Sequence, residues 1–198
     1  SIQENKIKKK FSKKFDSVYL KIKKDIDNTT NTLHILNNKF KFNFKLNDLK
    51  KFKRFKTVAI IGMGGSILGA EAIYNFLEKK VKKNFYFFNN LDSTKIINFK
   101  KKEDISKTLF IIISKSGNTI ETLSNTFALN ILKKNSKNII VISEKKKNIL
   151  FNLSKKLNLF HIEHKKYVGG RFSVLSEVGV VPAFFMGVNI IKFRSKIL

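Results

Sequence analysis

The sequence predicts an α/β fold, a three-layer αβα sandwich around a parallel sheet, preceded by a helical N-terminal extension. Three observations lead to this prediction. Short apolar runs alternate with amphipathic stretches of helix length from residue 57 onward. The apolar runs are nearly continuous, as in strands that are buried on both faces. Glycine-rich or serine-rich loops follow two of the runs, at the place where open parallel sheets usually bind ligands.

The first 50 residues differ from the rest of the chain, so we expect residues 1–50 to form a basic helical extension and residues 51–198 to form the α/β domain. Residues 6–27 carry apolar side chains at helical spacing between lysines, which predicts an amphipathic helix. Residues 39–46 alternate lysine or asparagine with phenylalanine or leucine, which predicts a strand or a half-buried edge segment. Interleaved lysine and phenylalanine is also a pattern that binds single-stranded nucleic acid, but we favour the structural role.

The α/β part divides into five strands and the helices that connect them. The apolar runs predict strands at residues 57–61, 85–88, 109–113, 138–142 and 159–164. The intervening periodicity predicts helices at 66–80, 93–101, 119–134 and 148–157, with Ser93 as the N-cap of the second. A further helix is expected over Pro182–Ile190. Right-handed βαβ crossovers would join these elements into one parallel sheet.

The net charge of +27 is the most unusual property of the composition, and it first indicates a nucleic-acid or anionic-membrane partner. However, 38 of the 41 basic residues are lysine, whereas the recognition of phosphates and bases favours the planar fork of arginine. The lysines are spread along the whole chain, and Lys, Asn, Ile and Phe all have A/T-rich codons. We therefore expect a solvated surface, with no specific nucleic-acid partner and no membrane partner.

The chain contains no cysteine, which excludes disulfides and thiolate metal sites. We expect a cytoplasmic protein. His161 and His164 lie three residues apart on a predicted strand, so their side chains should point to opposite sides of the sheet. We therefore expect no metal site, and we expect both histidines to be exposed or lightly buried.

The first loop, Gly62-Met63-Gly64-Gly65-Ser66-Ile67-Leu68-Gly69, follows the first predicted strand. Glycines there let the backbone approach a ligand closely, and the helix that follows offers free N–H groups to an anion. Ile67 stands where a dinucleotide-binding fingerprint needs its third glycine, and Ala70 follows Gly69 where a P-loop needs lysine. A plain turn between a strand and a helix remains the alternative.

The second loop, Ser114-Lys115-Ser116-Gly117-Asn118-Thr119-Ile120-Glu121-Thr122, follows the third predicted strand. It offers hydroxyls on Ser114, Ser116 and Thr119, and an ammonium group on Lys115. Together with the backbone amides around Gly117, these groups suit a phosphate without any metal ion. The alternative is a polar cap that only begins the next helix.

The third segment, residues 167–179, contains Gly169-Gly170-Arg171-Phe172-Ser173. Arg171 is one of only three arginines in the chain, with Arg54 and Arg194. An arginine retained among so many lysines indicates a position where lysine does not substitute.

Taken together, the three segments resemble the glucose-6-phosphate isomerase family over residues 57–190. The resemblance implies a sugar isomerase (SIS) domain with a flavodoxin-like sheet, and the absence of the second SIS subdomain from this chain. It implies a catalytic residue, Arg171, that stabilises the enediolate oxygen. It also implies that a set of loop residues contacts the sugar phosphate and its phosphate group: Gly65, Ser66, Ser114, Lys115, Ser116, Thr119 and Gly170.

The implied reaction interconverts glucose 6-phosphate and fructose 6-phosphate through a cis-enediol, in glycolysis and gluconeogenesis, with no cofactor. The full-length family member is expected to be a homodimer. The family's catalytic glutamate, histidine and lysine lie downstream of the Gly-Gly-Arg segment, so we expect an N-terminal part of an isomerase that lacks the base. Glu71, Glu121 and Glu177 are not expected to replace that base.

Two residues depart from the family pattern: Lys166 stands at an acidic or amide position, and Glu177 stands at a position for a small residue. The alternative function is a noncatalytic SIS module that binds a sugar phosphate for regulation. Such a module would have no need of the segment from Gly169 to Ser173.

Overall fold

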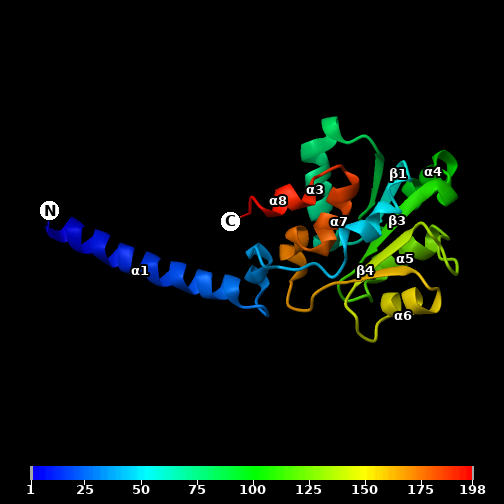
Figure 1. Ribbon diagram of the computed structural model, residues 1–198. Coiled ribbons are helices and arrows are strands. Elements are labelled where there is room, and N and C mark those ends of the chain that lie inside the picture. Colours follow the sequence, from blue (N-terminus) through cyan, green and yellow to red (C-terminus); the bar gives the residue numbers. More distant parts are fainter. Residues whose placement is uncertain (1, 198) are drawn as a thin grey trace.

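The computed structural model describes the backbone of residues 2–197 and the side chains of residues 10–197. It confirms the predicted α/β fold, with one parallel five-stranded sheet in the order β2-β1-β3-β4-β5 (Figure 1). The strands are β1 (Thr57–Ile61), β2 (Asn84–Phe88), β3 (Thr108–Ile113), β4 (Ile139–Ser143) and β5 (Phe160–Glu163). Each predicted strand lies within one residue of the observed bounds at either end.

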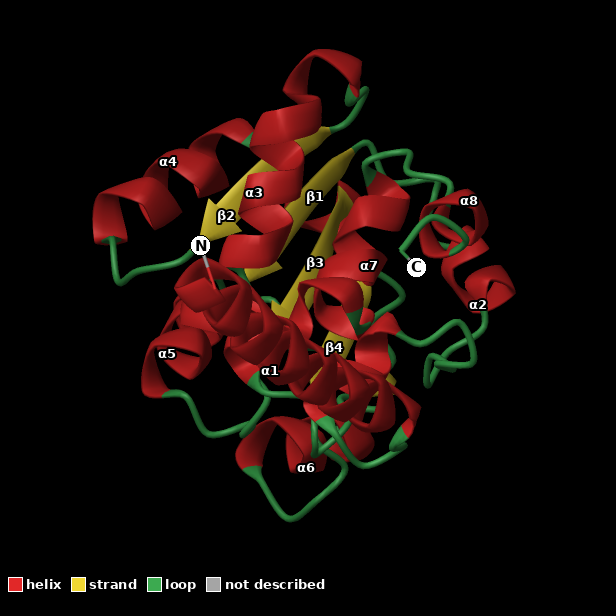
Figure 2. Cartoon of the chain, turned by 90° about the vertical axis from the view of Figure 1, so that its left-hand side faces the viewer, coloured by secondary structure: helices red, strands yellow, loops and turns green. Residues whose placement is uncertain are grey.

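Helices cover both faces of the sheet (Figure 2). The α-helices are α1 (Ile2–Asp27), α2 (Leu46–Lys50), α3 (Leu68–Leu77), α4 (Ser93–Lys102), α5 (Ile120–Ala128), α6 (Ile149–Lys156), α7 (Glu177–Phe185) and α8 (Ile190–Arg194). Val58 and Ile60 share a core with α3 and α7, whereas Ala59 and Ile61 share the opposite core with α4, α5 and α6. Because successive strand residues point to opposite faces, one apolar run supplies both cores.

The strand order positions the candidate site. β1 lies between β2 and β3, so the direction of winding reverses between β1 and β3. Open parallel sheets bind ligands at the carboxyl ends of the strands beside such a reversal. The Gly62 loop and the Ser114 loop follow these two neighbouring strands and therefore emerge side by side.

Helix α1 projects away from the rest of the molecule (Figure 1). Its last turn is tied down: the Ile26 carbonyl accepts from Nδ1 of His34 at 2.9 Å, and Asn37 donates to the Asp27 carboxylate at 2.9 Å. Phe11 and Phe15 on its predicted apolar stripe remain 69 % and 68 % exposed. The prediction of a helix is confirmed, but its apolar stripe stays exposed from Phe11 to Ile22, and Ile26 in the last turn is half-buried. No described helix is both long and apolar enough to cross a membrane.

The prediction of a strand at residues 39–46 is wrong: residues 40–45 form a loop with a bend at 43–44 that pairs with no strand of the sheet, and Leu46 already begins α2. Its period-two pattern reflects burial: Phe40 is buried, and Phe42 and Phe44 are half-buried. Their rings pack on one another, at 5.6 Å between Phe40 and Phe42 and 5.2 Å between Phe42 and Phe44. The alternation of polar and aromatic residues thus arises here from aromatic packing. This agrees with the alternative prediction that the segment is half-buried.

Several helix ends also differ from the predictions. Helix α5 stops at Ala128 instead of residue 134, since Asn130 adopts the left-handed conformation that asparagine tolerates, with φ 56°. The N-cap of α4 is Asp92 and not Ser93, because the Asp92 side chain accepts from the Lys95 amide at 2.9 Å.

Helix α7 begins at Glu177, five residues before the predicted start at Pro182, and Ser176 caps it. Nearly all of α7 is buried, so its sequence lacks the polar face that marks a helix in sequence.

Candidate functional site

Three hydroxyls of the second loop converge where β3 meets α5. The Ser114 and Thr119 hydroxyl oxygens lie 2.8 Å apart, and the Ser116 hydroxyl lies 3.5 Å from Ser114 and 3.4 Å from Thr119. Thr119 is the N-cap of α5, but its side chain makes no capping hydrogen bond. Ser114 is buried, Thr119 half-buried and Ser116 exposed. Since the first N–H groups of a helix lack intrahelical partners, this hydroxyl cluster stands at a natural anion seat.

The cluster is held in place by the N-terminus of α6. The Leu150 amide donates to the Gly117 carbonyl at 3.0 Å, and the Ile149 amide donates to the Asn118 side chain at 2.9 Å. Gly117 has φ +71°, and a Cβ there would overlap the side chain of Asn148. Glycine is therefore required by both the backbone conformation and the closeness of α6.

The first and third segments interlock. A Cβ on Gly65 would overlap the Gly170 carbonyl and would lie 2.9 Å from the Arg171 amide nitrogen. The Ser173 hydroxyl lies within hydrogen-bond distance of both carbonyls, at 3.1 Å from Gly65 and 2.7 Å from Gly170. Ser66, half-buried, ends the 3-10 turn that carries Gly65. The third segment thus passes directly over the glycine turn after β1.

Lys115 connects the second loop to the third segment and does not join the hydroxyl cluster. Its ammonium group donates to the Lys166 carbonyl at 2.8 Å and lies 3.8 Å from the carboxylate of Glu144. Glu144 is buried and also pairs with Lys146 at 2.5 Å. The predicted site residues are therefore assembled on three linked loops, with Lys115 as one of the links.

The guanidinium of Arg171 is exposed and, among the described side chains, has no hydrogen-bond or ion-pair partner. It lies in the 3-10 helix Gly170–Leu175, whose start is fixed against Gly65. A guanidinium without a counter-ion among the described side chains is available to an anion.

Two carboxylates near the loops have structural partners. Asn89 donates to the Glu71 carboxylate at 3.1 Å. Glu177 is fully buried, accepts from the Asn43 amide at 2.9 Å, and leaves its second oxygen without a partner among the described residues. Burial raises the pKa of Glu177. The buried carboxylate of Glu177 thus anchors the segment that contains Asn43.

The histidines of β5 occupy separate surroundings. His161 contacts the ring of Phe151 and the Ser143 hydroxyl, and burial lowers its pKa to about 4. His164 is almost completely buried, whereas an exposed or lightly buried ring was expected, and its Nδ1 donates to the Lys165 carbonyl at 2.9 Å. Burial also lowers the pKa of His164, which favours the neutral ring.

Two residues that support the site were missed by sequence reasoning. Asn148 accepts from the Phe151 amide at 2.8 Å and donates to the Glu144 carbonyl at 2.9 Å, so it caps α6 and packs on Gly117. Glu144 follows the predicted fourth strand as a lone acid before three lysines. Its position just after a predicted strand could have indicated that it lies near the candidate site, since neighbouring parallel strands end at the same edge of the sheet.

Comparison with known proteins identifies the family. The family model for phosphoglucose isomerase matches residues 23–194. The chain is 36 % identical over 177 residues to a probable glucose-6-phosphate isomerase of Methanococcus maripaludis, covering 85 % of this chain and 40 % of that protein. It is 40 % identical over 145 residues to the glucose-6-phosphate isomerase of Borreliella afzelii, covering 65 % and 26 %. The chain thus spans less than half the length of these relatives.

Solved structures agree. A hypothetical protein from Thermus thermophilus matches with a TM-score of 0.66 and 26 % identity, covering 76 % of this chain and 38 % of that one. A glucose-6-phosphate isomerase from Chlamydia trachomatis matches with a TM-score of 0.59 and 26 % identity, covering 69 % and 27 %. With its three loops assembled at the carboxyl edge of the sheet and matched by the family model, this chain belongs to the phosphoglucose isomerase family.

Proposed function

We propose that this chain is the sugar-phosphate-binding portion of a glucose-6-phosphate isomerase, which interconverts glucose 6-phosphate and fructose 6-phosphate. The observation that carries the proposal is the cluster of three hydroxyls at the start of α5, beside the interlocked first and third loops. It combines hydroxyl donors with the positive end of a helix, which is what a dianionic phosphate needs.

In this proposal the phosphate contacts the hydroxyls of Ser116 and Thr119 and the first amides of α5. Ser114 is buried and already donates or accepts within the cluster, so it orients the other two hydroxyls. Lys115 adds positive potential from the side while holding the Lys166 carbonyl. Gly65, Ser66 and Gly170 bring backbone close to the sugar, since side chains there are small or absent.

Arg171 is proposed to face the carbons that react. During isomerisation an oxygen next to these carbons becomes negatively charged, mainly in the transition state and the enediol intermediate. A permanently charged guanidinium at that position stabilises this charge more than it stabilises the bound sugar, which lowers the barrier. Arginine keeps its charge at any physiological pH, so the effect does not depend on its own titration.

Proton transfer between the two carbons is assigned to groups outside this chain. Glu71 and Glu177 are held by Asn89 and by the Asn43 amide, and a base must lie within hydrogen-bond reach of the proton that it takes. The chain also covers only 40 % and 26 % of the two relatives compared above. We therefore expect phosphate binding without turnover from this chain alone.

Calorimetric titration with 6-phosphogluconate, whose carboxylate imitates the enediolate, tests the binding site. We expect saturable binding that weakens by about tenfold or more in the Ser116→Ala plus Thr119→Ala variant, because two hydrogen bonds to a charged group are lost. The matched control is Ser12→Ala plus Ser17→Ala on the exposed α1, which should bind as the unaltered chain does. Equal weakening of both variants would contradict the proposed phosphate seat.

A second titration separates an isomerase site from a site that only senses sugar phosphates. Glucitol 6-phosphate carries the same phosphate but no carboxylate. If Arg171 faces the enediolate, Arg171→Gln weakens binding of 6-phosphogluconate more than binding of glucitol 6-phosphate. Equal losses for the two ligands would instead favour the noncatalytic SIS module.

A further inference from the structure

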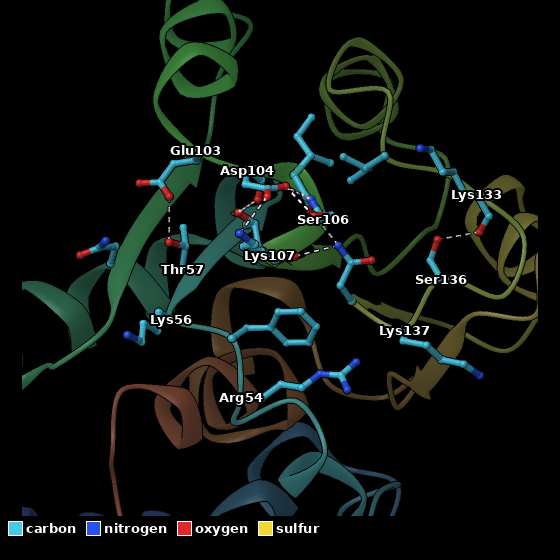
Figure 3. Close-up of a pocket in the computed structure, with 16 residues that line it drawn as sticks. Arg54, Lys56, Thr57, Glu103, Asp104, Ser106, Lys107, Lys133, Ser136 and Lys137 are labelled. Atoms are coloured by element: carbon cyan, nitrogen blue, oxygen red, sulfur yellow. Dashed lines mark hydrogen bonds and ion pairs between the residues drawn. The ribbon is translucent and has the colours of Figure 1, made fainter.

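The edge of the sheet opposite the three loops carries a cleft that the proposed isomerase reaction does not use (Figure 3). It has a volume of about 1070 Å³ and is formed where β1, β2, β3 and β4 begin. Five cationic side chains line it, drawn from the segments that precede three strands: Arg54 and Lys56 before β1, Lys107 before β3, and Lys133 and Lys137 before β4. All five side chains are exposed.

Four of these cations have no ion-pair partner among the described side chains, and the fifth has a weak one, with Lys107 3.7 Å from Asp104. The two acids in the cleft are already engaged. Glu103 accepts from the Thr57 hydroxyl at 2.9 Å and the Tyr86 hydroxyl at 2.7 Å, and Asp104 accepts from the Ser106 amide at 2.7 Å. These neutral donors leave both acids charged, so five cations against two acids give the cleft a formal net charge of +3 (5 − 2), and such charge attracts anions.

Most uncharged hydrogen-bond donors that line the cleft are already bound to acceptors of the protein. The Asn138 amide group donates to the Ile105 and Thr108 carbonyls at 2.9 and 2.8 Å. The Ser136 hydroxyl donates to the Lys133 carbonyl at 2.8 Å, and the Ser106 hydroxyl to Asp104 at 2.6 Å. Sugar hydroxyls would find few partners here, so the cleft suits a ligand that is recognised through its charge.

The place of Arg54 supports a specific role for this charge. Of the three arginines in a chain of 38 lysines, Arg171 lies on the sugar-phosphate loops, and Arg194 donates to the Ile35 and Asn37 carbonyls at 2.7 Å. Arg54 makes no such bond among the described residues and rests on the ring of Phe55 at 5.0 Å. A guanidinium supported in this way keeps its planar N–H donors available for two phosphate oxygens at once.

The cleft continues along the sheet edge. A second cavity of about 500 Å³ shares Arg54, Ser136 and Lys137 with it and reaches Phe160, the first residue of β5. The two cavities together pass under all five strands, a span of roughly 19 Å at the usual spacing of adjacent strands. The rings of Phe52 and Phe55 along this path are buried and offer no free face to a nucleotide base.

We propose that this amino-edge cleft binds a linear polyphosphate anion, at a site separate from the sugar-phosphate loops. Its cations come from three segments that repel one another, so a chain of closely spaced phosphates lying between them would neutralise several at once. Free uncharged donors and aromatic faces are scarce in the described cleft: Asn84 is the one lining amide side chain without a hydrogen bond, and the half-buried Phe160 lies at the far end of the second cavity. We therefore expect recognition by charge and shape, not by a sugar or a base.

The test is calorimetric titration of the full chain with inorganic tripolyphosphate in roughly 0.1 M salt, where long-range attraction is screened beyond about 10 Å. The cleft variant is Arg54→Gln, Lys133→Gln and Lys137→Gln. The matched variant removes three charges from α1, by Lys13→Gln, Lys14→Gln and Lys21→Gln, so both fall by three from +27. We expect the cleft variant to bind about tenfold more weakly or worse, and the α1 variant to change by less than about twofold.

Equal weakening in the two variants would overturn the proposal, because net charge alone would then explain the binding. A short oligothymidylate that binds more tightly than tripolyphosphate, and that is lost in the same cleft variant, would also overturn it in favour of nucleic acid. Thermal unfolding of both variants checks that they are folded. Titration with 6-phosphogluconate should be unaffected by the cleft variant, so a failure here is distinguishable from a failure of the proposed isomerase site.

Discussion

The carboxyl and amino edges of the sheet differ in the types of residue that form them. At the carboxyl edge, glycines and hydroxyls bring three loops into contact, with the Gly170 carbonyl lying where a Cβ of Gly65 would be. At the amino edge, five exposed cationic side chains line a cleft. Close backbone packing at Gly65 and Gly117 shapes the carboxyl edge, whereas positive charge distinguishes the amino edge. Substitutions should therefore act mainly on stability and geometry at the first edge, and mainly on electrostatics at the second.

The largest effect is expected from Gly65→Val. The added side chain would occupy the space of the Gly170 carbonyl, so the third segment must move away from the turn after β1. We expect a loss of about 3 kcal/mol in the free energy of unfolding and weaker 6-phosphogluconate binding. Urea denaturation measures the loss in the free energy of unfolding. Gly170→Ala is the comparison, since a Cβ there meets no atom within 4 Å, and it should cost far less. Equal costs would show that the loops are not interlocked.

A double-mutant cycle on Gly117 and Asn148 comes next. Gly117→Ala places a methyl group on the Asn148 side chain and in a left-handed conformation, while Asn148→Ala removes the cap of α6, worth about 1 kcal/mol. Because the double variant removes the overlap, it should lose less stability than the sum of the two single variants. Simple additivity in chemical denaturation would contradict the close packing of α6 on the hydroxyl loop.

The buried carboxyl of Glu177 gives a smaller, pH-dependent effect. Its pKa is raised in the folded state by burial, so its contribution to stability is fully present below the unfolded pKa and is lost as pH rises through the folded pKa. The Glu177→Gln variant cannot ionise at this position, so it does not lose stability as pH rises. The glutamine side-chain oxygen can still accept from the Asn43 amide. We expect the variant to be more stable than the unaltered chain at neutral pH, with the difference closing in acid. Thermal unfolding across pH would contradict this if the difference widened in acid.

The smallest effect on stability belongs to the amino edge. Single changes such as Lys133→Gln or Lys137→Gln should alter the free energy of unfolding by less than about 0.5 kcal/mol, because these side chains are exposed and unpaired in the described structure. Any gain from reduced repulsion should vanish in about 1 M salt, where charges are screened beyond about 3 Å. A large, salt-independent loss would mean that these lysines hold the fold together.

The same difference explains what the sequence could predict. The buried strands are local patterns, and the structure confirms each of them within one residue at either end. The first two motif loops are local patterns as well, and the structure places them directly after β1 and β3, as predicted. What escaped prediction depends on contacts between distant segments. Phe40 and Phe42 alternate like a strand because they pack on one another, and α7 hides its start because it is buried on nearly all sides. Asn148 packs on Gly117 although the two residues are 31 positions apart in the sequence. The cations of the amino-edge cleft come from three separate segments. No local sequence motif therefore predicts either feature.

The most direct test of the account is amide hydrogen exchange, with and without 6-phosphogluconate, read separately at the two edges. When the ligand binds, we expect slower exchange at residues 62–66 and 114–122 of the carboxyl edge. We expect no change at residues 104–107 and 133–138 of the amino edge. Protection confined to the amino edge, or spread evenly over the lysine-rich surface, would contradict a sugar-phosphate site in the three loops.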